Sequence, residues 1–248
     1  MEPFAKSNLT IIVPAYNEGK TIEETILSLK RQTILPEKII VIDDCSTDDT
    51  AQRARRLGVI VITPPGNTWS KAGAQNYALN LVDTEFVMAV DADTTLAADA
   101  VEKLLVAIRE QGVAAACGYV VPRHVHTMWE RGRYIEYMFA FSFYKEIQDY
   151  YEKPLISSGC FSVYRTEILK KHNGWSTRTL AEDMDITWSF YRFGYRVRFV
   201  PEACCFPVEP HNYRFMSKQL KRWSHGFMQN VRLHLRHVMK IGYLRMLV

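Results

Sequence analysis

The chain has 248 residues, 48% of them hydrophobic, which is enough for one large α/β domain with a full core. Its formal net charge of +4 is unevenly spread, because residues 210–248 contain eight Lys or Arg and no Asp or Glu, which leaves the remainder at 4 − 8 = −4. The five cysteines are scattered and odd in number, which excludes a disulfide framework and the paired spacing of a zinc site. We therefore expect a reducing, cytoplasmic environment.

No segment has the composition of a membrane span or of a secretory leader. Residues 1–8 lack the apolar core of a signal peptide, and no run reaches the roughly 18 uninterrupted apolar residues of a spanning helix. We therefore expect the chain as given not to cross a membrane. The basic run after residue 210 is typical of a solvated helical face, and also of a segment that contacts anionic lipid or a phosphate-bearing substrate. No nucleic-acid-binding motif accompanies it, so nucleic acid is not an expected partner.

The first 110 residues alternate between short apolar runs and helical patterns. We predict strands at residues 9–13, 38–42, 59–62 and 85–90, and helices at residues 18–31, 48–57 and 98–110. This order indicates an α/β fold with an open, mostly parallel, Rossmann-like sheet flanked by helices, in which ligands bind beyond the carboxyl ends of the strands. The polar residues at those ends are residues 14–18, Asp43 with Asp44, and Asp91 with Asp93.

Beyond about residue 112 this alternation fades, and an aromatic stretch follows at residues 127–151. Its spacing predicts one amphipathic helix that breaks before Pro154. Ordinary core packing is the first interpretation of these aromatic side chains. The alternative is an acceptor platform or a membrane-interface helix.

Asp91 and Asp93 are the first candidates for chemistry. Two carboxylates separated by one residue at the end of a buried strand can hold one hard cation such as Mg²⁺ or Mn²⁺, while phosphate and water fill its other positions. The same segment resembles the nucleophile loop of haloacid-dehalogenase-type phosphatases, in which Asp91 would attack a phosphoryl group. In that family the loop normally ends the first strand of the core, whereas three predicted strands precede it here.

The wider pattern of motifs resembles the family 2 glycosyltransferases with the GT-A fold. The matching segments stand in the family's order at residues 13–18, 43–48, 71–76, 91–93, 158–162, 182–183 and 219–223. The last segment is similar to the motif of processive, membrane-associated members that make cellulose, chitin, hyaluronan or poly-N-acetylglucosamine. The resemblance implies an inverting, metal-dependent transfer from a UDP-sugar to a saccharide or lipid-linked acceptor, with a β-glycosidic product. A non-catalytic sugar-binding derivative of the fold is a further alternative.

Carried over position by position, the resemblance implies a donor site and a metal site. The implied donor contacts are Pro14, Ala15, Tyr16, Glu18, Asp43, Asp44, Lys71, Asp91 and Arg222. Either Asp43 or Asp44 accepts a hydrogen bond from the base, and Lys71 approaches the diphosphate. Asp93, together with Asp91, coordinates Mg²⁺ or Mn²⁺.

The remaining residues of the resemblance form the acceptor side. Asp183 is implied as the base that removes the proton from the acceptor hydroxyl. The implied acceptor contacts are Glu182, Gln219 and Trp223. Asp185 is a local competitor for the role of base, and acids that merely open a helix are the structural alternative. The family usually has Thr immediately before the Glu-Asp pair, where this chain has Ala181.

We predict one catalytic domain over residues 1–248. Residues 1–110 would form its nucleotide-binding half, residues 111–210 its acceptor-binding half, and residues 211–248 a basic, amphipathic helical tail at a membrane interface. On this tail, His234 and His237 are expected to face solvent or lipid headgroups. The expected location is the cytoplasmic face of a membrane.

Overall fold

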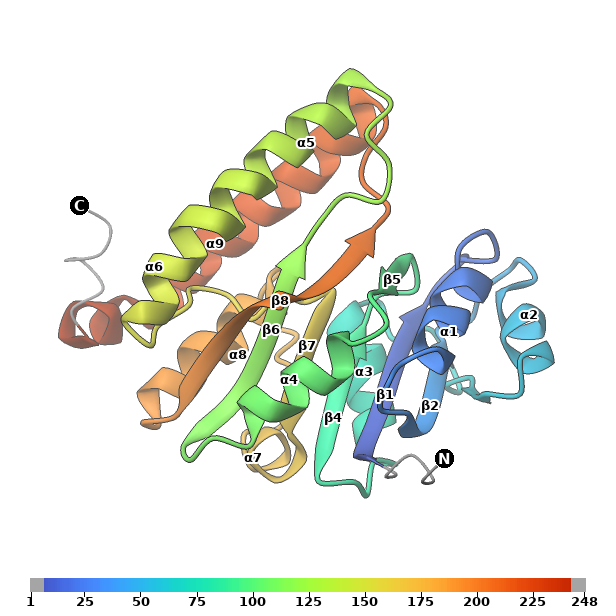
Figure 1. Ribbon diagram of the computed structural model, residues 1–248, viewed down its shortest axis with the longest axis horizontal. Coiled ribbons are helices and arrows are strands. Elements are labelled where there is room, and N and C mark those ends of the chain that lie inside the picture. Colours follow the sequence, from blue (N-terminus) through green and yellow to red (C-terminus); the bar gives the residue numbers. More distant parts are fainter. Residues whose placement is uncertain (1–6, 242–248) are drawn as a thin grey trace.

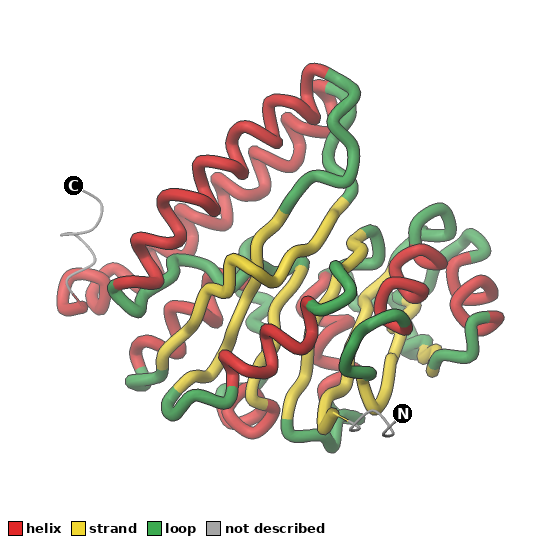
Figure 2. The backbone as a smooth tube through the Cα atoms, in the orientation of Figure 1, coloured by secondary structure: helices red, strands yellow, loops and turns green. Residues whose placement is uncertain are grey.

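A computed structural model describes residues 7–241, with side chains described up to residue 236. Its elements are, in chain order, β1 (Ser7–Ala15), α1 (Ile22–Lys30), β2 (Pro36–Asp43), α2 (Thr50–Arg56), β3 (Ile60–Ile62), α3 (Lys71–Leu79), β4 (Phe86–Val90), β5 (Thr94–Leu96), α4 (Ala100–Ile108), β6 (Val113–Val120), α5 (Met128–Phe139), the π-helix η1 (Ala140–Tyr144), α6 (Lys145–Tyr150), β7 (Phe161–Arg165), α7 (Thr166–Lys171), α8 (Glu182–Arg192), β8 (Arg196–Pro207) and α9 (Tyr213–Ile241). The strands form one eight-stranded sheet with helices on both faces (Figure 1 and Figure 2).

The sheet has the strand order β3-β2-β1-β4-β7-β6-β8-β5. β1 pairs in parallel with β2 and β4, β2 with β3, and β6 with β8. β7 is antiparallel to β4 and β6, and β5 is antiparallel to β8. Six strands therefore run in one direction, while β5 and β7 run in the opposite direction. The predicted α/β fold with a mostly parallel sheet is confirmed, and the two reversed strands make the sheet mixed.

Of the strands predicted for the first 110 residues, β1, β2 and β4 are covered on both faces of the sheet, whereas the edge strand β3 has Ile60 at 46% exposure. In β1, Leu9, Ile11 and Val13 pack in one apolar cluster with α1 and α4, while Ile12 lies in a second cluster with α3 and α8. Successive side chains of a strand point to opposite faces, so a strand covered on both sides needs a continuous apolar run. This is the pattern from which these strands can be predicted.

The segments that follow β1 and β4 differ from the prediction. α1 begins at Ile22 rather than at residue 18, because Asn17 adopts a left-handed conformation (φ 57°) and the Glu18 carbonyl closes a turn by accepting from the amides of Thr21 and Ile22. The short strand β5 begins directly after Asp93 and is absent from the sequence prediction. The later start of α1 leaves Glu18 at the edge of the sheet rather than inside the predicted helix.

Two long helical segments follow β6 and β8. α5, η1 and α6 form one continuous helical segment over residues 128–150, and α9 lies beside it (Figure 1). The rings of Trp129 on α5 and Tyr213 on α9 stand 5.6 Å apart. Over residues 7–241, no helix has both the length and the apolar character needed to cross a bilayer.

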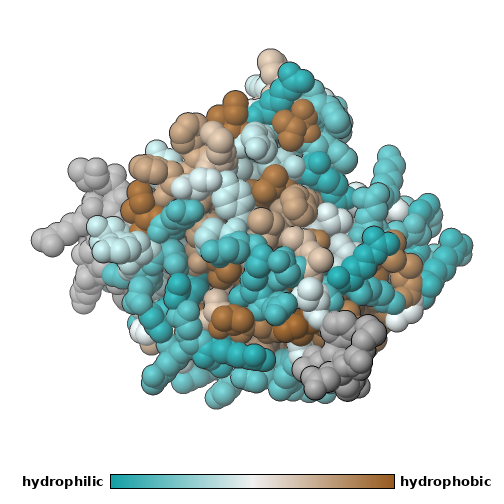
Figure 3. All heavy atoms as spheres, in the orientation of Figure 1, coloured by the Kyte–Doolittle hydropathy of each residue, from teal (hydrophilic) through white to brown (hydrophobic). Residues whose placement is uncertain are grey.

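The aromatic stretch is helical as predicted, but core packing is the wrong interpretation for most of its rings. Phe141 is buried, packed against β6 and β8 through Tyr119 and Phe199. The exposed rings are Tyr134, Phe139, Phe143, Tyr144, Tyr150 and Tyr151. Figure 3 shows hydrophobic residues gathered over this part of the surface. The α5–α6 segment therefore presents a largely apolar face to solvent.

Candidate active site

Most of the predicted donor residues meet at the carboxyl ends of β1, β2 and β4, as expected for parallel strands. A cleft of about 240 Å³ opens there, lined by Pro14, Ala15, Tyr16, Glu18, Asp44, Ser70, Lys71, Ala74, Asp91, Ala92 and Asp93. Of the predicted donor contacts, Asp43 and Arg222 stand outside this lining.

Asp43 and Asp44 follow one another at the end of β2 but have different partners. Thr68 donates to both carboxylate oxygens of Asp44, from its amide to Oδ1 at 2.7 Å and from its hydroxyl to Oδ2 at 2.9 Å. Asp43 is 5% exposed, and its Oδ2 accepts from the Thr63 hydroxyl at 3.4 Å. Asp43 Oδ1 is buried and has no hydrogen-bond partner among the described residues. Asp44 therefore fixes a loop, whereas Asp43 keeps an unused acceptor.

Lys71 is the first residue of α3 and connects several polar groups of the cleft. Its ammonium contacts the Asp91 carboxylate, donates to the Gly159 carbonyl oxygen at 2.8 Å and lies 3.9 Å from Glu182 Oε1. Burial opposes its charge, but the carboxylates of Asp91 and Glu182 outweigh burial and raise the pKa of Lys71. Lys71 is therefore held as a cation between these acids.

The acids of the cleft are crowded. Burial, together with the charges of Asp91 and Glu18, raises the pKa of Asp93 to about 7. Burial and the charge of Asp91 also raise the pKa of Glu18. The hydrogen bond that Thr21 donates to Glu18 lowers this pKa but does not cancel the rise. Like charges at close range disfavour ionisation, so the pocket has an excess of negative charge that a cation would relieve.

The carboxylates of Asp91 and Asp93 are suitable ligands for a divalent cation. Among the described residues, no group of three or more His, Cys, Asp or Glu side chains forms a complete metal site. Mg²⁺ is commonly bound by one or two carboxylates when substrate phosphates and water supply the other ligands. Asp91, which is paired with Lys71, and Asp93, whose ionisation is opposed by burial and by neighbouring acids, are such a set, so the residues fit Mg²⁺ or Mn²⁺ on a phosphate-bearing donor.

The backbone of one residue, Gly159, joins the cleft to the predicted base Asp183. Gly159 accepts from Lys71 through its carbonyl oxygen and donates its amide hydrogen to Asp183 Oδ2 at 3.0 Å. A Cβ on Gly159 would lie 2.9 Å from the same oxygen, so only glycine fits this approach without movement. Asp183 is the second residue of α8, and its Oδ1 accepts from the Met184 amide at 2.8 Å. These contacts place Asp183 beside the donor cleft.

Asp185, the competing candidate for the base, is fully engaged elsewhere. It is 1% exposed, and Arg178 donates to both of its oxygens, from Nε at 2.7 Å and from Nη2 at 2.6 Å. The Nε2 atom of His234 on α9 lies 2.7 Å from Asp185 Oδ1. Although burial opposes ionisation, these partners lower the pKa of Asp185 to about 2. Asp185 therefore joins α8 to α9, and its burial keeps it from contact with an acceptor substrate.

The same contact corrects the expectation for the histidines of α9. His234 is 1% exposed and faces Asp185 and the ring of Trp188, so the prediction that it faces solvent or headgroups is wrong. The side chain of His237 lies outside the described residues.

α9 packs against the segment that precedes the base. A Cβ on Gly226 would lie 2.6 Å from the Cβ of Ala181, and the Asn230 amide donates to the Ala181 carbonyl at 3.0 Å. Gln219 and Arg222 stand seven and four positions before Gly226, on the same face of the helix. The helix thus directs this face toward the base, although neither side chain is part of the cleft lining.

Trp223 is also outside the cleft lining and is held from the side of α5. The guanidinium of Arg133, which is 1% exposed, lies 4.6 Å from the centre of the Trp223 ring. Glu209 accepts from Arg133 Nε at 3.3 Å, and the Tyr137 hydroxyl accepts from Arg133 Nη2 at 2.8 Å. Trp223 is therefore fixed against a buried polar network.

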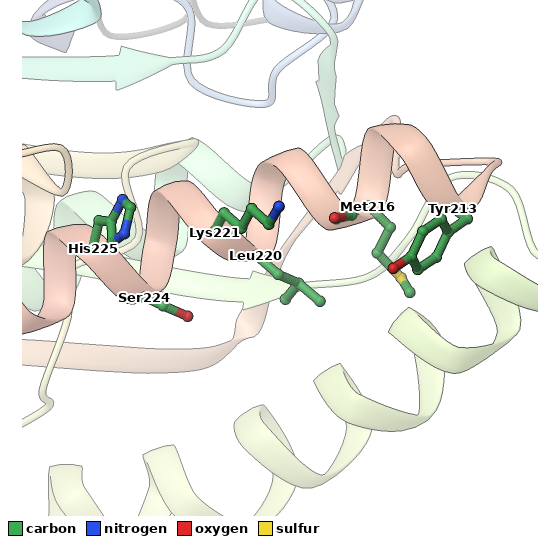
Figure 4. Close-up of a pocket in the computed structure, with 7 residues that line it drawn as sticks. Tyr213, Met216, Leu220, Lys221, Ser224 and His225 are labelled. Atoms are coloured by element: carbon green, nitrogen blue, oxygen red, sulfur yellow. The ribbon is translucent and has the colours of Figure 1, made fainter.

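A shallow groove of about 310 Å³ runs along another stripe of α9 (Figure 4). It is lined by Tyr213, Met216, Ser217, Leu220, Lys221, Ser224 and His225. Tyr213 and Leu220 are exposed. This stripe is apolar with a basic margin and contains no acidic residue.

The family model for glycosyl transferase family 2 matches residues 10–172, about two thirds of the chain. The chain belongs to this family. This membership overturns the phosphatase interpretation of Asp91, which also follows the fourth strand of the sheet rather than the first.

Curated relatives include poly-beta-1,6-N-acetyl-D-glucosamine synthases from Staphylococcus aureus and Staphylococcus epidermidis. Each is 25% identical over 222 residues, which cover 88% of this chain and 54% of the relative. The chain therefore spans about half the length of the curated relatives it matches.

Solved structures confirm the GT-A fold. The mannosyltransferase PcManGT from Pyrobaculum calidifontis, in complex with GDP-Man and Mn²⁺, is similar with a TM-score of 0.74 and 21% identity, covering 95% of this chain and 68% of that chain. S. aureus TarS 1-349 in complex with UDP-GlcNAc is similar with a TM-score of 0.63 and 22% identity, covering 84% and 60%. At these identities the likeness establishes the fold alone.

Three residues that shape the site have no assigned role in the sequence analysis. Thr68 fixes Asp44, Gly159 joins Lys71 to Asp183, and Arg178 orients Asp185. Gly159 lies inside the family motif at residues 158–162, so the sequence could mark its position as part of the site. The sequence could not show that its partners are Lys71 and Asp183. Thr68 contacts Asp44 across 24 positions, and Arg178 contacts Asp185 across the turn before α8; neither pairing follows from a local sequence pattern.

Proposed function

We propose that the chain is an inverting, metal-dependent transferase that moves a sugar from a UDP-sugar to a saccharide or lipid-linked acceptor and forms a β-glycosidic bond. The observation that carries this proposal is the connection from Asp91 through Lys71 and Gly159 to Asp183, because it sets a phosphate site beside a carboxylate base. The TarS complexes with UDP and UDP-GlcNAc, and the name of the staphylococcal synthases, support a UDP-sugar. UDP-N-acetylglucosamine is therefore the first donor to test.

In the proposed reaction, Asp183 takes the proton from the acceptor hydroxyl while the oxygen of that hydroxyl attacks the anomeric carbon. The bond between the anomeric carbon and the diphosphate oxygen breaks, UDP leaves from the opposite side, and the configuration inverts. Lys71 stabilises the negative charge that develops on the diphosphate. A divalent cation held by Asp91 and Asp93 would supply further positive charge to the same phosphates.

The nucleotide is recognised by the segments after β1 and β2. In this proposal the free Oδ1 of Asp43 accepts from the uracil N–H, since both oxygens of Asp44 already accept from Thr68. Tyr16 is 53% exposed at the cleft and offers a ring to the base. Pro14, Ala15 and Glu18 complete the lining on this side.

The acceptor lies on the side of Asp183 that faces α9. We assign Glu182, Gln219 and Trp223 to the acceptor and Arg222 to the diphosphate. Gln219 Oε1 is buried without a hydrogen-bond partner among the described residues, so it is an available acceptor for a sugar hydroxyl. A growing saccharide held here can be extended repeatedly, which is the processive form of the proposal.

We further propose that α5, α6 and α9 lie against the cytoplasmic face of a membrane. The exposed rings of the α5–α6 segment are apolar, and α9 belongs to a stretch with many cations and no acids. This combination favours an interface with anionic lipid. Residues 1–110 then hold the nucleotide, residues 111–210 the acceptor, and residues 211–248 form the basic helical tail at the surface.

A panel of UDP-sugars tests the proposal by the release of UDP, measured with and without Mg²⁺ or Mn²⁺ and with or without membrane fractions. UDP with metal is expected to raise the Tm by mass action on the folded state. Asp183→Asn is expected to abolish UDP release while keeping this rise in Tm. A Tm that does not change on addition of UDP, with or without metal, would refute the proposed nucleotide site. UDP binding without turnover of any UDP-sugar would favour a non-catalytic derivative of the fold.

A further inference from the structure

A second pocket, larger than the donor cleft, lies between the C-terminal ends of α7 and α8. Its volume is about 520 Å³, compared with about 240 Å³ for the donor cleft. This volume falls within the range of small-molecule sites. None of the residues that line it is acidic, and they include Lys171, Arg178 and Arg192.

Two of these cations have no ionic partner in the described part of the chain. Neither Lys171 nor Arg192 takes part in an ion pair there, and both are exposed. Both stand in the last turn of their helices, where a cation balances the helix dipole. The dipole explains each cation separately, but not why the two helix ends and the Arg178 loop enclose one pocket free of acids.

Arg178 is held in one orientation for an anion. The buried Asp185 carboxylate accepts from its Nε and Nη2 atoms, while the Arg178 side chain is 50% exposed. The Nη1 group has no such partner in the described residues and remains available. A planar guanidinium fixed on one side by a buried carboxylate loses little freedom when a phosphate binds on the other side.

The pocket also has an aromatic wall. The imidazole of His172 stacks on the Phe193 ring at 4.1 Å between centroids, and the Tyr195 ring packs against its edge at 5.8 Å. Burial and the neighbouring Lys171 lower the pKa of His172. At neutral pH this residue therefore contributes a flat surface rather than a charge, and Phe193 is 56% exposed beside it.

We propose that this pocket binds a phosphate-bearing small molecule through Lys171, Arg178 and Arg192, separately from the donor cleft. The ligand's phosphate lies among the three cations and its organic part lies along His172 and Phe193.

The experiment titrates the full chain with inorganic pyrophosphate and, separately, with AMP. The buffer contains EDTA so that no metal supports diphosphate binding at the donor cleft. The site-specific readout is the imidazole C–H resonances of His172, assigned by comparison with His172→Gln. We expect saturable shifts of these resonances and a rise in Tm with both probes. AMP is expected to cause the larger shift because its ring reaches the aromatic wall.

Arg192→Gln and Lys171→Gln are each expected to weaken binding about tenfold, the effect of losing one charge-assisted contact. Lys170→Gln is the matched control, since it removes the same charge from the same helix but lies outside the pocket and donates to Val82. Unchanged His172 resonances in the wild type, or equal affinity in the pocket variants and the control, would show that these cations serve only the helix dipoles. Binding in this metal-free assay does not depend on sugar transfer, so its failure and the failure of the proposed transferase activity are distinguishable.

Discussion

The amide of Gly159 donates to Asp183 Oδ2 at 3.0 Å, and there is no space for a side chain between them. Gly159→Ala is therefore expected to push Asp183 away from its position and to lower kcat on the order of a hundredfold, since small misplacements of a reacting group have effects of this size. Donor affinity should change little. Steady-state kinetics with the accepted UDP-sugar measure this.

Gly132→Ala is the control for that change. No atom lies within 4 Å of a Cβ added there, and it sits inside α5, where alanine is the better helix former. It is expected to keep full activity with an unchanged or slightly higher Tm. Equal activity of the Gly159 and Gly132 variants would remove Gly159 from the catalytic arrangement.

Asp43 and Asp44 are expected to respond differently to the same substitution. Asp43→Asn should weaken UDP binding about tenfold by removing a charged acceptor from the base, with little effect on the Tm. Asp44→Asn should lower the Tm, because its NH₂ group replaces one of the two oxygens that accept from Thr68. Isothermal titration with UDP, together with thermal unfolding, separates the two. The reverse pattern would assign recognition of the uracil to Asp44.

Asp93→Ala is expected to abolish the part of the UDP-dependent rise in Tm that requires Mg²⁺ or Mn²⁺. It should also raise the Tm of the metal-free protein, because it relieves the repulsion between Asp93, Asp91 and Glu18. Differential scanning calorimetry over a metal titration measures both effects. Asp99→Ala, on an exposed pair with Lys103, is the control and should leave the metal dependence intact.

Asp185 contributes stability that depends on pH. Its pKa is about 2 in the folded chain, below the ordinary 3.8, so the contribution is present above pH 4 and is lost as the pH falls toward 2. The shift corresponds to roughly 2 kcal/mol. Asp185→Asn should therefore lower the free energy of unfolding in urea at pH 7, and the deficit should shrink toward pH 3. Asp83→Asn, on an exposed pair, should show no comparable deficit.

The proposed membrane contact predicts binding to vesicles. Phe143→Ser combined with Tyr150→Ser should reduce sedimentation with phosphatidylserine-containing vesicles without lowering the Tm, because both rings are largely exposed in the folded chain. Added salt should weaken binding further by screening the basic tail. Equal sedimentation of the variant and the wild type would refute a contact through this face.

The sequence supports the N-terminal part of the fold better than the rest. β1, β2 and β4 are continuous apolar runs because helices cover both of their faces. β6 is harder to predict because it is built from small residues, and it needs them: a Cβ on Gly118 would lie 2.3 Å from the Phe161 ring. β8 alternates between buried and partly exposed residues as a strand should, but Pro201 interrupts this alternation, so the sequence indicates a strand only weakly.

In the site, strand order alone could place Asp91, Asp93 and Lys71 near one another. It could not separate Asp43 from Asp44, because the difference lies in Thr68, 24 positions later. The burial of His234 could not be predicted from the sequence either, since its partner Asp185 lies 49 positions away. Residues that follow the ends of strands can thus be predicted from order, whereas hydrogen-bond partners across the fold cannot.

The reversed direction of β7 determines which of its residues reach the candidate active site. The parallel strands bring their final residues to this edge, whereas β7 brings the residues that precede its start. Phe161 pairs with Val90, and the Asp91 amide donates to the Cys160 carbonyl at 3.2 Å. A shift of β7 by one residue would turn its side chains to the opposite faces and withdraw Gly159 from both partners. The register of this single strand pair therefore sets the separation between Asp91, on the proposed diphosphate side, and Asp183, the proposed base.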